Sequence, residues 1–459
     1  MKEVSLIKQK FIVDFFKALE CKRDYCILRN YENYPEKMGD DIDIIVDAPD
    51  DSVVKDEILP IIEKLGWDYY VKFHKDGFTP IICMYTTNDT VDTCQIDVYT
   101  KFQWRGNLFA DGKSVLASKV RYKDFLVASH GADLAITVAK EFMGSHKVRS
   151  KYRTKMAKFA KDDKEGFYSV LAGIYGELTD TLYNYCLSEE FDKIDALSND
   201  FMKRVKSQDR LLYTKRSLSG TLERLKHWFK PEGKLIAFVG PDGSGKTTLI
   251  GKMDDYMERL FPHNSKIFHR RYEIFPELKT GLGLSSMKGQ ISSGKPGTEK
   301  KVKDPNKKVK RSFISKLATL FVVFYYTFEY FIGNFIAYKL VARRTLVLYD
   351  RYYYDHFVQP TSRDVIWPLR HLLLALVRKP DLIVHLIASG DHIFKRKQDL
   401  NPKEIDNQNF YMSRVLTCCK NVEDLNMEQL NADQVAAEVF RMTVNKFYGF
   451  RPKENPKEA

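Results

Sequence analysis

The 459-residue sequence predicts an α/β protein in which a doubly wound parallel sheet follows an α+β domain with a helical extension. Three observations predict this order. An apolar run at 235–239 leads into a glycine-rich loop and then a helical pattern. Further strand-like runs at 345–350 and 381–387 alternate with helical stretches, as parallel strands do. In the N-terminal half, two apolar runs that are expected to form strands carry acidic residues.

The composition is typical of a folded protein in a reducing compartment. Hydrophobic residues make up 44% of the chain and aromatic residues 13%, which is enough for two or three well-packed domains. The seven cysteines show no Cys-x-x-Cys spacing, so neither a disulfide framework nor a zinc site is expected. Residues 1–16 have scattered charges and lack the apolar centre of a signal peptide. We therefore expect a cytoplasmic location.

Much of the net charge of +13 is local. Residues 282–311 hold nine Lys or Arg residues against two acidic ones, and they are rich in Gly, Ser and Pro without apolar periodicity. This composition is typical of a mobile loop, and contact with a polyanion or a membrane surface is the alternative. The rest of the chain is mildly basic and shows no helix-turn-helix or RNA-binding signature, so no specific nucleic-acid partner is expected.

The glycine-rich loop is predicted to bind phosphate. GPDGSGKTT, residues 240–248, matches the pattern G-x-x-x-x-G-K-[ST] between a strand and a helix. Its glycines let backbone N–H groups point at phosphate oxygens, and the helix N-terminus adds partial positive charge. Lys246 is expected to reach the β and γ phosphates, and Thr247 to hold Mg²⁺. The candidate cofactor-binding residues are Gly240, Asp242, Gly243, Ser244, Gly245, Lys246, Thr247 and Thr248.

Charged residues end two later strand-like runs. The run at 266–272 contains Arg270 and Arg271, whose planar guanidinium groups match an acceptor phosphate, although a solvated pair at a strand end is the alternative. The run at 345–350 delivers Asp350 beside the loop, where its carboxylate can hold Mg²⁺ directly or through water. Arg351 would then face the acceptor.

Five segments, in this order, resemble the thymidylate kinase family: GPDGSGKTT, YDRYYYD, KPDLIVHLI, the basic pair at 396 and 397, and LNADQVAAEV. The likeness covers residues 232 to 449. It implies a P-loop kinase of the nucleoside-monophosphate-kinase type, which uses ATP and Mg²⁺ and phosphorylates a small molecule that already carries a phosphate. By this likeness the candidate catalytic residues are Lys246, Asp350, Arg351 and Arg396, with Arg396 and Lys397 in a closing lid.

The same region departs from that family on its acceptor side. HRRYEIFPEL stands in place of the Thr-Arg-Glu-Pro-Gly loop, and YYDHFVQPTSRD replaces a serine-rich sequence with a Tyr-Gln pair. The form looks more like the divergent thymidylate kinase-like proteins encoded among bacterial surface-polysaccharide genes. The candidate substrate-binding residues are Arg270, Arg271, Arg351 and Arg363, and for Arg363 a surface arginine is the alternative.

The apolar stretch at 316–344 is predicted to be a kinase helix, not a membrane span. Its longest charge-free run, 317–328, has twelve residues and ends before Glu329. A span needs ~20 residues. A span here would also separate the strands at 235–239 and 345–350, which must be neighbours in one sheet. A surface that rests on a bilayer is the alternative.

Acidic residues mark the N-terminal half. Asp41 and Asp43 lie at i and i+2 in one strand-like run and project from the same face, and Asp97 lies in a second run at 94–99. Three carboxylates from two strands suit a two-metal transfer onto a nucleoside triphosphate, and these residues are the candidate metal ligands of this half. An acidic turn that enters a strand is the alternative.

The segment LRNYENYPEKMGDDIDIIVD resembles the nucleotidyltransferase superfamily, and in particular an uncharacterised nucleotidyltransferase-like family found in natural-product and polysaccharide gene clusters. The likeness covers residues 20 to 160. Asp40 stands where the superfamily has a serine that contacts triphosphate, so a domain that keeps the fold without the chemistry is the alternative. The cations of 140–153 would meet a triphosphate, or else form a solvated helix face.

The predicted regions are a nucleotidyltransferase-like domain at 1–160, a helical extension at 161–230 and a thymidylate kinase-like domain at 231–459. The expected function is an ATP- and Mg²⁺-dependent kinase joined to a nucleotidyltransferase-like domain, by resemblance in surface-polysaccharide assembly. The alternatives are a silent half that acts as a nucleotide-binding regulatory module, or nucleotidyl transfer as the main activity. A homodimer and peripheral contact with a membrane both stay open.

Overall fold

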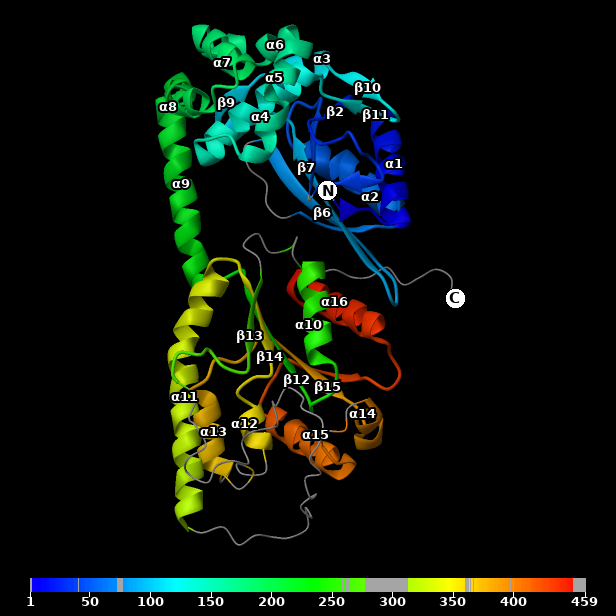
Figure 1. The fold of residues 1–459 in the computed structure, drawn as a ribbon, viewed down its shortest axis with the longest axis vertical. Coiled ribbons are helices and arrows are strands. Elements are labelled where there is room, and N and C mark those ends of the chain that lie inside the picture. Colours follow the sequence, from blue (N-terminus) through cyan, green and yellow to red (C-terminus); the bar gives the residue numbers. More distant parts are fainter. Residues whose placement is uncertain are drawn as a thin grey trace. The chain divides into compact units, whose positions relative to one another are not determined.

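The computed structural model describes residues 2–39, 41–71, 77–257, 260, 265–276, 313–359, 363, 365, 367–396, 398 and 400–448. Asp40, Lys397 and the basic segment 282–311 lie outside the described residues. The chain divides into two compact units, Met1–Leu225 with Val444–Ala459, and Lys226–Thr443. Each unit has its own central sheet (Figure 1).

The first unit is built on a seven-stranded mixed sheet in the order β10-β11-β2-β4-β7-β6-β5. β4 and β7 pair in parallel, and Asp43 lies opposite Asp97 in their register. The strands of this sheet are β2 (Tyr25–Ile27), β4 (Asp41–Val46), β5 (Asp68–Val71), β6 (Phe78–Thr86), β7 (Val91–Tyr99), β10 (Val120–Tyr122) and β11 (Phe125–Val127). Two small sheets pair β1 (Lys2–Glu3) with β3 (Lys37–Met38), and β8 (Phe102–Trp104) with β9 (Asn107–Ala110).

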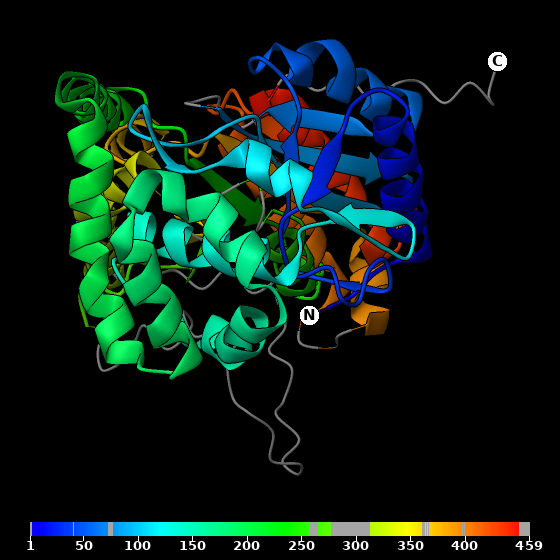
Figure 2. The same cartoon turned by 90° about the horizontal axis from the view of Figure 1, so that it is seen from above.

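Helices cover both faces of the seven-stranded sheet. α1 (Leu6–Glu20), the π-helical turn η1 (Val54–Ile58) and α2 (Leu59–Lys64) pack on the face that carries Ile42 and Ile44. The opposite face carries Ile45 and packs against a helical layer, which Figure 2 shows in teal and green, away from the blue α1. Because side chains alternate along β4, Asp41 and Asp43 project toward this helical layer.

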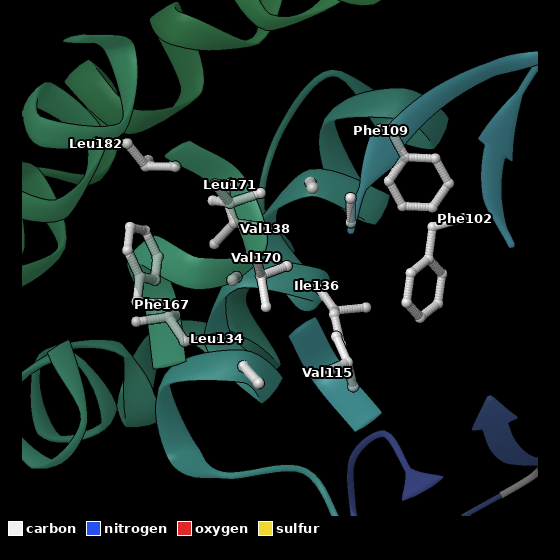
Figure 3. Close-up of a cluster of buried hydrophobic side chains, with 14 of the residues drawn as sticks. Phe102, Phe109, Val115, Leu134, Ile136, Val138, Phe167, Val170, Leu171 and Leu182 are labelled. Carbon is white, nitrogen blue, oxygen red and sulfur yellow. The ribbon is translucent and has the colours of Figure 1, made fainter. Parts of the chain in front are cut away.

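The helical layer shares one hydrophobic core, in which side chains such as Phe102, Ile136 and Val170 interdigitate (Figure 3). Its helices are α3 (Gly112–Ala117), α4 (His130–Ser145), α5 (Ser150–Asp162), α6 (Lys164–Tyr175), α7 (Glu177–Leu187) and α8 (Phe191–Gln208). α6 to α8, which the sequence predicts as an extension, therefore pack in the same core as α4 and α5. α9 (Arg210–Phe229) follows them and runs across the boundary of the two units.

The second unit has a five-stranded sheet in the order β13-β14-β12-β15-β16, and every pair in it is parallel. Its strands are β12 (Lys234–Val239), β13 (Ser265–His269), β14 (Leu346–Asp350), β15 (Leu382–Ile387) and β16 (Val422–Asn426). The predicted neighbourhood of the 235–239 and 345–350 strands is confirmed, since β12 pairs directly with β14. β13 and β14 lie on one side of β12, and the later strands β15 and β16 lie on the other side. In sheets of this kind, ligands bind beside the carboxyl ends of the strands where the order changes sides.

Both faces of this sheet are covered by helices. Alternate residues of β12 pack with the long helix α11 (Phe313–Ala342), while α10 (Lys246–Met257) and α16 (Ala432–Tyr448) lie together on the other side (Figure 1). The remaining helices are α12 (Asp355–Val358), α13 (Trp367–Ala375), α14 (Gly390–Arg396) and α15 (Pro402–Leu416). This mixed α/β arrangement around a parallel sheet is consistent with a P-loop kinase-like fold.

Candidate functional site

The loop between β12 and α10 requires glycine. Gly240, Gly243 and Gly245 have φ angles of 145°, 89° and 90°, a region that favours residues without a Cβ. A Cβ on Gly240 would lie 2.6 Å from the carbonyl oxygen of Leu386 on β15. The glycine spacing seen in the sequence is therefore what allows the loop to curl back over the end of the sheet.

Lys246 begins α10 with its side chain buried against this loop. Its Nζ donates to the carbonyl oxygens of Gly240 at 2.9 Å and Pro241 at 2.7 Å, and to Ser244 Oγ at 3.3 Å. These three acceptors are uncharged and hold the ammonium group in the loop. A phosphate placed in the loop would meet that charge together with the backbone N–H groups of the α10 N-terminus.

Asp350 ends β14 beside the loop. Its Oδ2 accepts a hydrogen bond from Thr247 Oγ1 at 2.8 Å and lies 3.1 Å from His269 Nδ1. Its Oδ1 is buried and has no hydrogen-bond partner among the described residues. A carboxylate oxygen without a partner, next to a threonine hydroxyl, is the kind of hard-oxygen donor set that Mg²⁺ takes. Thr247 and Asp350 therefore fit the predicted metal.

Two arginines directly follow β13 and β14. Arg270 and Arg351 have φ angles of 64° and 68°, in the left-handed region that non-glycine residues rarely adopt. Their backbone N–H groups donate to Asp350 O at 2.8 Å and to Phe238 O at 3.0 Å, which holds them in this conformation. β13 thus ends at His269, before the arginines that the sequence assigns to the strand. Backbone strain of this kind clusters at functional sites.

Arg351 lies between two carboxylates. It forms an ion pair with Asp242 in the loop, and its Nε is 4.0 Å from Asp355 Oδ2. Burial raises the pKa of Asp355, an effect that Arg351 and Lys246 oppose. Arg270 Nε is buried without a hydrogen-bond partner among the described residues. Lys246, Asp350 and these two arginines therefore gather at the carboxyl edge of three neighbouring strands.

Three other predicted residues have different surroundings. Arg271 Nε donates to the buried Glu329 at 3.0 Å, and its guanidinium stacks on Tyr326. Arg363 Nη2 donates to Glu404 Oε1 at 2.7 Å. Arg396 is exposed at the end of α14. The structure thus ties Arg271 and Arg363 to carboxylates of their own unit.

The acidic residues of the first unit lie close together on the neighbouring parallel strands β4 and β7. One carboxylate oxygen each from Asp41, Asp43 and Asp97 lie within 4.8 Å of one another. Both oxygens of Asp43 are engaged, since Oδ2 accepts from Arg29 Nε at 2.7 Å and Oδ1 from Lys140 Nζ at 2.8 Å. Lys140 is one of the cations for which the sequence leaves open either a contact with triphosphate or a place on a solvated helix face, whereas the sequence does not single out Arg29.

The pKa values of Asp43 and Asp97 in this cluster are shifted in opposite directions. Burial would raise the pKa of Asp43, but Lys140 and Arg29 lower it to about 2. Burial and the nearby Asp43 and Asp41 raise the pKa of Asp97 to about 7. A divalent cation would relieve the repulsion at Asp97, so the cluster fits a metal there, while Asp43 already has two cationic partners.

A separate pocket of about 720 Å³ lies in the first unit. It is bordered by the β10–β11 hairpin and by the ends of α3, α4, α5 and α6, and includes His130 with Asp162 at 2.8 Å. None of the predicted site residues lines it. The pocket therefore adds nothing to the acidic cluster.

Comparisons with known proteins give distant likenesses. No family model and no curated protein matches the chain. Among solved structures, thymidylate kinase from Ehrlichia chaffeensis is similar at 14% identity and a TM-score of 0.30, over 46% of this chain and 98% of that chain. The YorR protein of Bacillus subtilis in complex with phosphorylated GDP is similar at 12% identity and a TM-score of 0.27, over 47% and 99%. Likenesses this distant carry no argument about activity.

The buried Asp133 of α4 gives a pH-dependent stability. Burial raises its pKa from 3.8 to about 7, although a hydrogen bond from Thr137 lowers it. A raised pKa means that its stabilising contribution is fully present below 3.8 and lost as pH rises through about 7. We expect the difference in unfolding free energy between Asp133→Asn and the parent chain to grow in favour of the variant from pH 4 to pH 8. The increase should be on the order of 3 kcal/mol.

Denaturant unfolding of the full chain at these two pH values checks this expectation. Thr137→Val, which removes the hydrogen bond to Asp133, should steepen the pH dependence of the parent chain. An Asp133→Asn difference that is the same at both pH values would contradict it.

Proposed function

We propose that the second unit is an ATP- and Mg²⁺-dependent phosphotransferase that acts on a phosphorylated small molecule. The observation that carries this proposal is the hydrogen bond of 2.8 Å between Thr247 and Asp350, which joins the phosphate-binding loop to the end of the neighbouring parallel strand. By resemblance, the acceptor is a nucleotide or a sugar phosphate of surface-polysaccharide assembly.

The residues of the second unit have three proposed roles. The backbone of 240–248 and Lys246 bind the ATP phosphates, and Lys246 balances the charge that grows on them during transfer. Thr247 and Asp350 would hold Mg²⁺, which when bound neutralises phosphate oxygens. Arg270 and Arg351 face the acceptor, where a planar guanidinium can hold a phosphate in place.

The test is ³¹P NMR of the full chain with ATP and Mg²⁺ and a panel of nucleoside monophosphates and sugar phosphates. We expect ADP together with a new phosphate signal for one acceptor class. ADP formation that is independent of any acceptor, or no ADP at all, would contradict the proposal.

We propose further that the first unit is nucleotidyltransferase-like, with Asp41, Asp43 and Asp97 as its metal-binding residues. The parallel register that sets Asp43 opposite Asp97 supports this. Lys140 and Arg29 would hold the Asp43 carboxylate in its ionised form. This is the form that can bind a divalent ion, either free or carried by a triphosphate.

In Asp97→Asn, the affinity for the divalent metal that supports pyrophosphate release is expected to fall by at least about 10- to 100-fold. The loss of an outer-shell ligand alone typically has an effect of this size. ADP formation by the second unit should stay unchanged. Pyrophosphate assays at varied Mn²⁺ or Mg²⁺ concentration measure the first effect, and the ³¹P assay measures the second. Asp92→Asn, on the same strand, is the matched control.

A silent first unit is the second candidate. The observation that favours it is that Arg29 and Lys140 already neutralise Asp43. In that case the unit would bind nucleotide without releasing pyrophosphate, and Asp97→Asn would change neither product.

A further inference from the structure

α9, a single helix from Arg210 to Phe229 (Figure 1), exposes a stripe of large apolar side chains. The five members have exposed fractions between 53% and 86%. The helical repeat of ~3.6 residues per turn places all five within a sector of about 60° on one side of the helix. We name them the α9 stripe: Leu211, Leu218, Leu222, Leu225 and Phe229. A contiguous apolar patch of this kind indicates an interaction surface.

The other side of α9 is held by the turn between β8 and β9. Arg105 Nη1 donates to Ser217 Oγ at 2.9 Å, and Arg105 Cζ lies 5.1 Å from the centre of the Tyr213 ring. A Cβ on Gly106 would lie 2.8 Å from the side chain of Leu212, so the helix packs closely on this turn. These contacts fix which side of α9 faces the first unit, and the α9 stripe is therefore turned to solvent.

Basic side chains border the α9 stripe. Residues 203–230 hold nine Lys or Arg residues against two acidic ones. Arg210 lies on one edge of the stripe and Lys215 and Lys226 lie on the other, and all three are exposed. The acidic Glu223 is farther round the helix from the stripe than these three cations. The exposed side of α9 thus has an apolar centre between positive edges.

We propose that α9 binds the surface of an anionic lipid bilayer, with the α9 stripe at the boundary between headgroups and acyl chains. Leucine and aromatic residues on one face, with lysine and arginine beside them, are typical of helices that lie in a membrane interface. The stems of Lys and Arg can lie along the apolar boundary while their charged ends stay among the headgroups. Six of the twenty residues of α9 are charged, which suits a helix on the surface and not one that crosses the bilayer.

The charges favour a lipid surface over a second copy of this chain. Two α9 helices that covered each other's stripe would bring Arg210, Lys215 and Lys226 of both copies to one interface, and like charges placed together there are unfavourable. An anionic bilayer has the opposite charge, and each Lys or Arg held near it adds to the attraction. The helix in which Leu317–Ala342 are long and apolar enough to cross a membrane, by length and composition, is α11. Within that range 317–338 contain no Lys or Arg, so the stripe of α9 has a cationic border that α11 lacks.

The first experiment is flotation of the full chain with vesicles of phosphatidylcholine, with and without phosphatidylserine. We expect an affinity at least about 10-fold higher for the anionic vesicles. Leu218→Glu with Leu222→Glu should lower that affinity at least about 10-fold, because two apolar side chains no longer enter the boundary. Both are exposed, so the variant should keep its unfolding midpoint. Leu372→Glu with Phe410→Glu adds the same charge at equally exposed positions on α13 and α15 and should leave flotation unchanged.

A second experiment tests the cations. Lys215→Gln with Lys226→Gln should lower the affinity for the anionic vesicles on the order of 10-fold and leave the weak binding to phosphatidylcholine unchanged. A parent chain that does not float with anionic vesicles overturns the proposal. Flotation that the two leucine changes do not reduce also overturns it, because binding would then come from another basic part of the chain. So do leucine changes that alter the mass of the chain in light scattering without altering flotation, which would assign the stripe to a second copy.

Discussion

Replacing Lys246 by alanine is expected to reduce ADP production by the second unit by about 100- to 1,000-fold, the usual loss when one preorganised charge at a developing anion is removed. The ammonium group sits in the loop on neutral acceptors, so its charge is the part of the loop that the backbone cannot replace. The change should affect kcat more than binding of the acceptor, whose proposed contacts are Arg270 and Arg351. Steady-state ADP formation with the acceptor found by ³¹P NMR measures it.

Lys252→Ala is the matched control for this prediction. Lys252 lies on the same helix, and its ammonium group pairs with Asp433 on α16. Its loss should leave ADP formation within about twofold, because an exposed ion pair contributes little to either stability or charge in the loop. Asp350→Ala should also abolish ADP production. Full activity in both Lys246→Ala and Asp350→Ala would refute the kinase assignment.

The phosphate-binding loop could be predicted because its whole geometry is local. Nine consecutive residues encode the glycine conformations, the lysine and the hydroxyl, and the flanking strand and helix follow from short-range patterns. The neighbourhood of β12 and β14 followed from the same reasoning, since an Asp at the end of an apolar strand needs to lie beside that loop. The structure confirms this pairing.

The partners of the other charges could not be predicted, because they come from distant parts of the chain. Arg271 and Glu329 are far apart in sequence, and Glu329 shows in the sequence only as a charge that interrupts an apolar stretch. Arg29 likewise follows an apolar strand, as many surface arginines do. Only the antiparallel pairing of β2 with β4 brings it to Asp43.

How far the hydrophobic core of the first unit extends also could not be predicted from the sequence. Apolar spacing predicts helices through 161–208, but every amphipathic helix has an apolar face, and the pattern does not say which face it covers. Phe167 and Phe201 enter the same core as Phe102 and Ile136, so the helices belong to the layer that covers β4 and β7. This layer is what brings Lys140 to the acidic cluster.

The buried ion pair between Arg29 and Asp43 predicts a large effect on stability. Arg29→Ala should destabilise the first unit by about 3 to 5 kcal/mol, because it leaves a buried carboxylate with one of its two cations removed. The Arg29 and Asp43 side chains are 7% and 1% exposed, so water cannot replace the guanidinium. The Asp43 contribution should be fully present above its ordinary pKa of 3.8 and lost as pH falls through about 2.

Hydrogen exchange of β4 and β7 in the full chain, as a function of denaturant, measures this effect in the first unit itself. Arg23→Ala is the control, since Arg23 also forks onto one carboxylate, that of Glu57, but is 40% exposed. Its loss should cost far less than the loss of Arg29, because an exposed ion pair contributes little to stability. Arg29→Ala combined with Asp43→Asn should cost less than the sum of the two single changes, because the unpaired charge is then removed with its partner. Equal costs for Arg29→Ala and Arg23→Ala would mean that the buried pair between Arg29 and Asp43 stabilises the first unit no more than an exposed pair does.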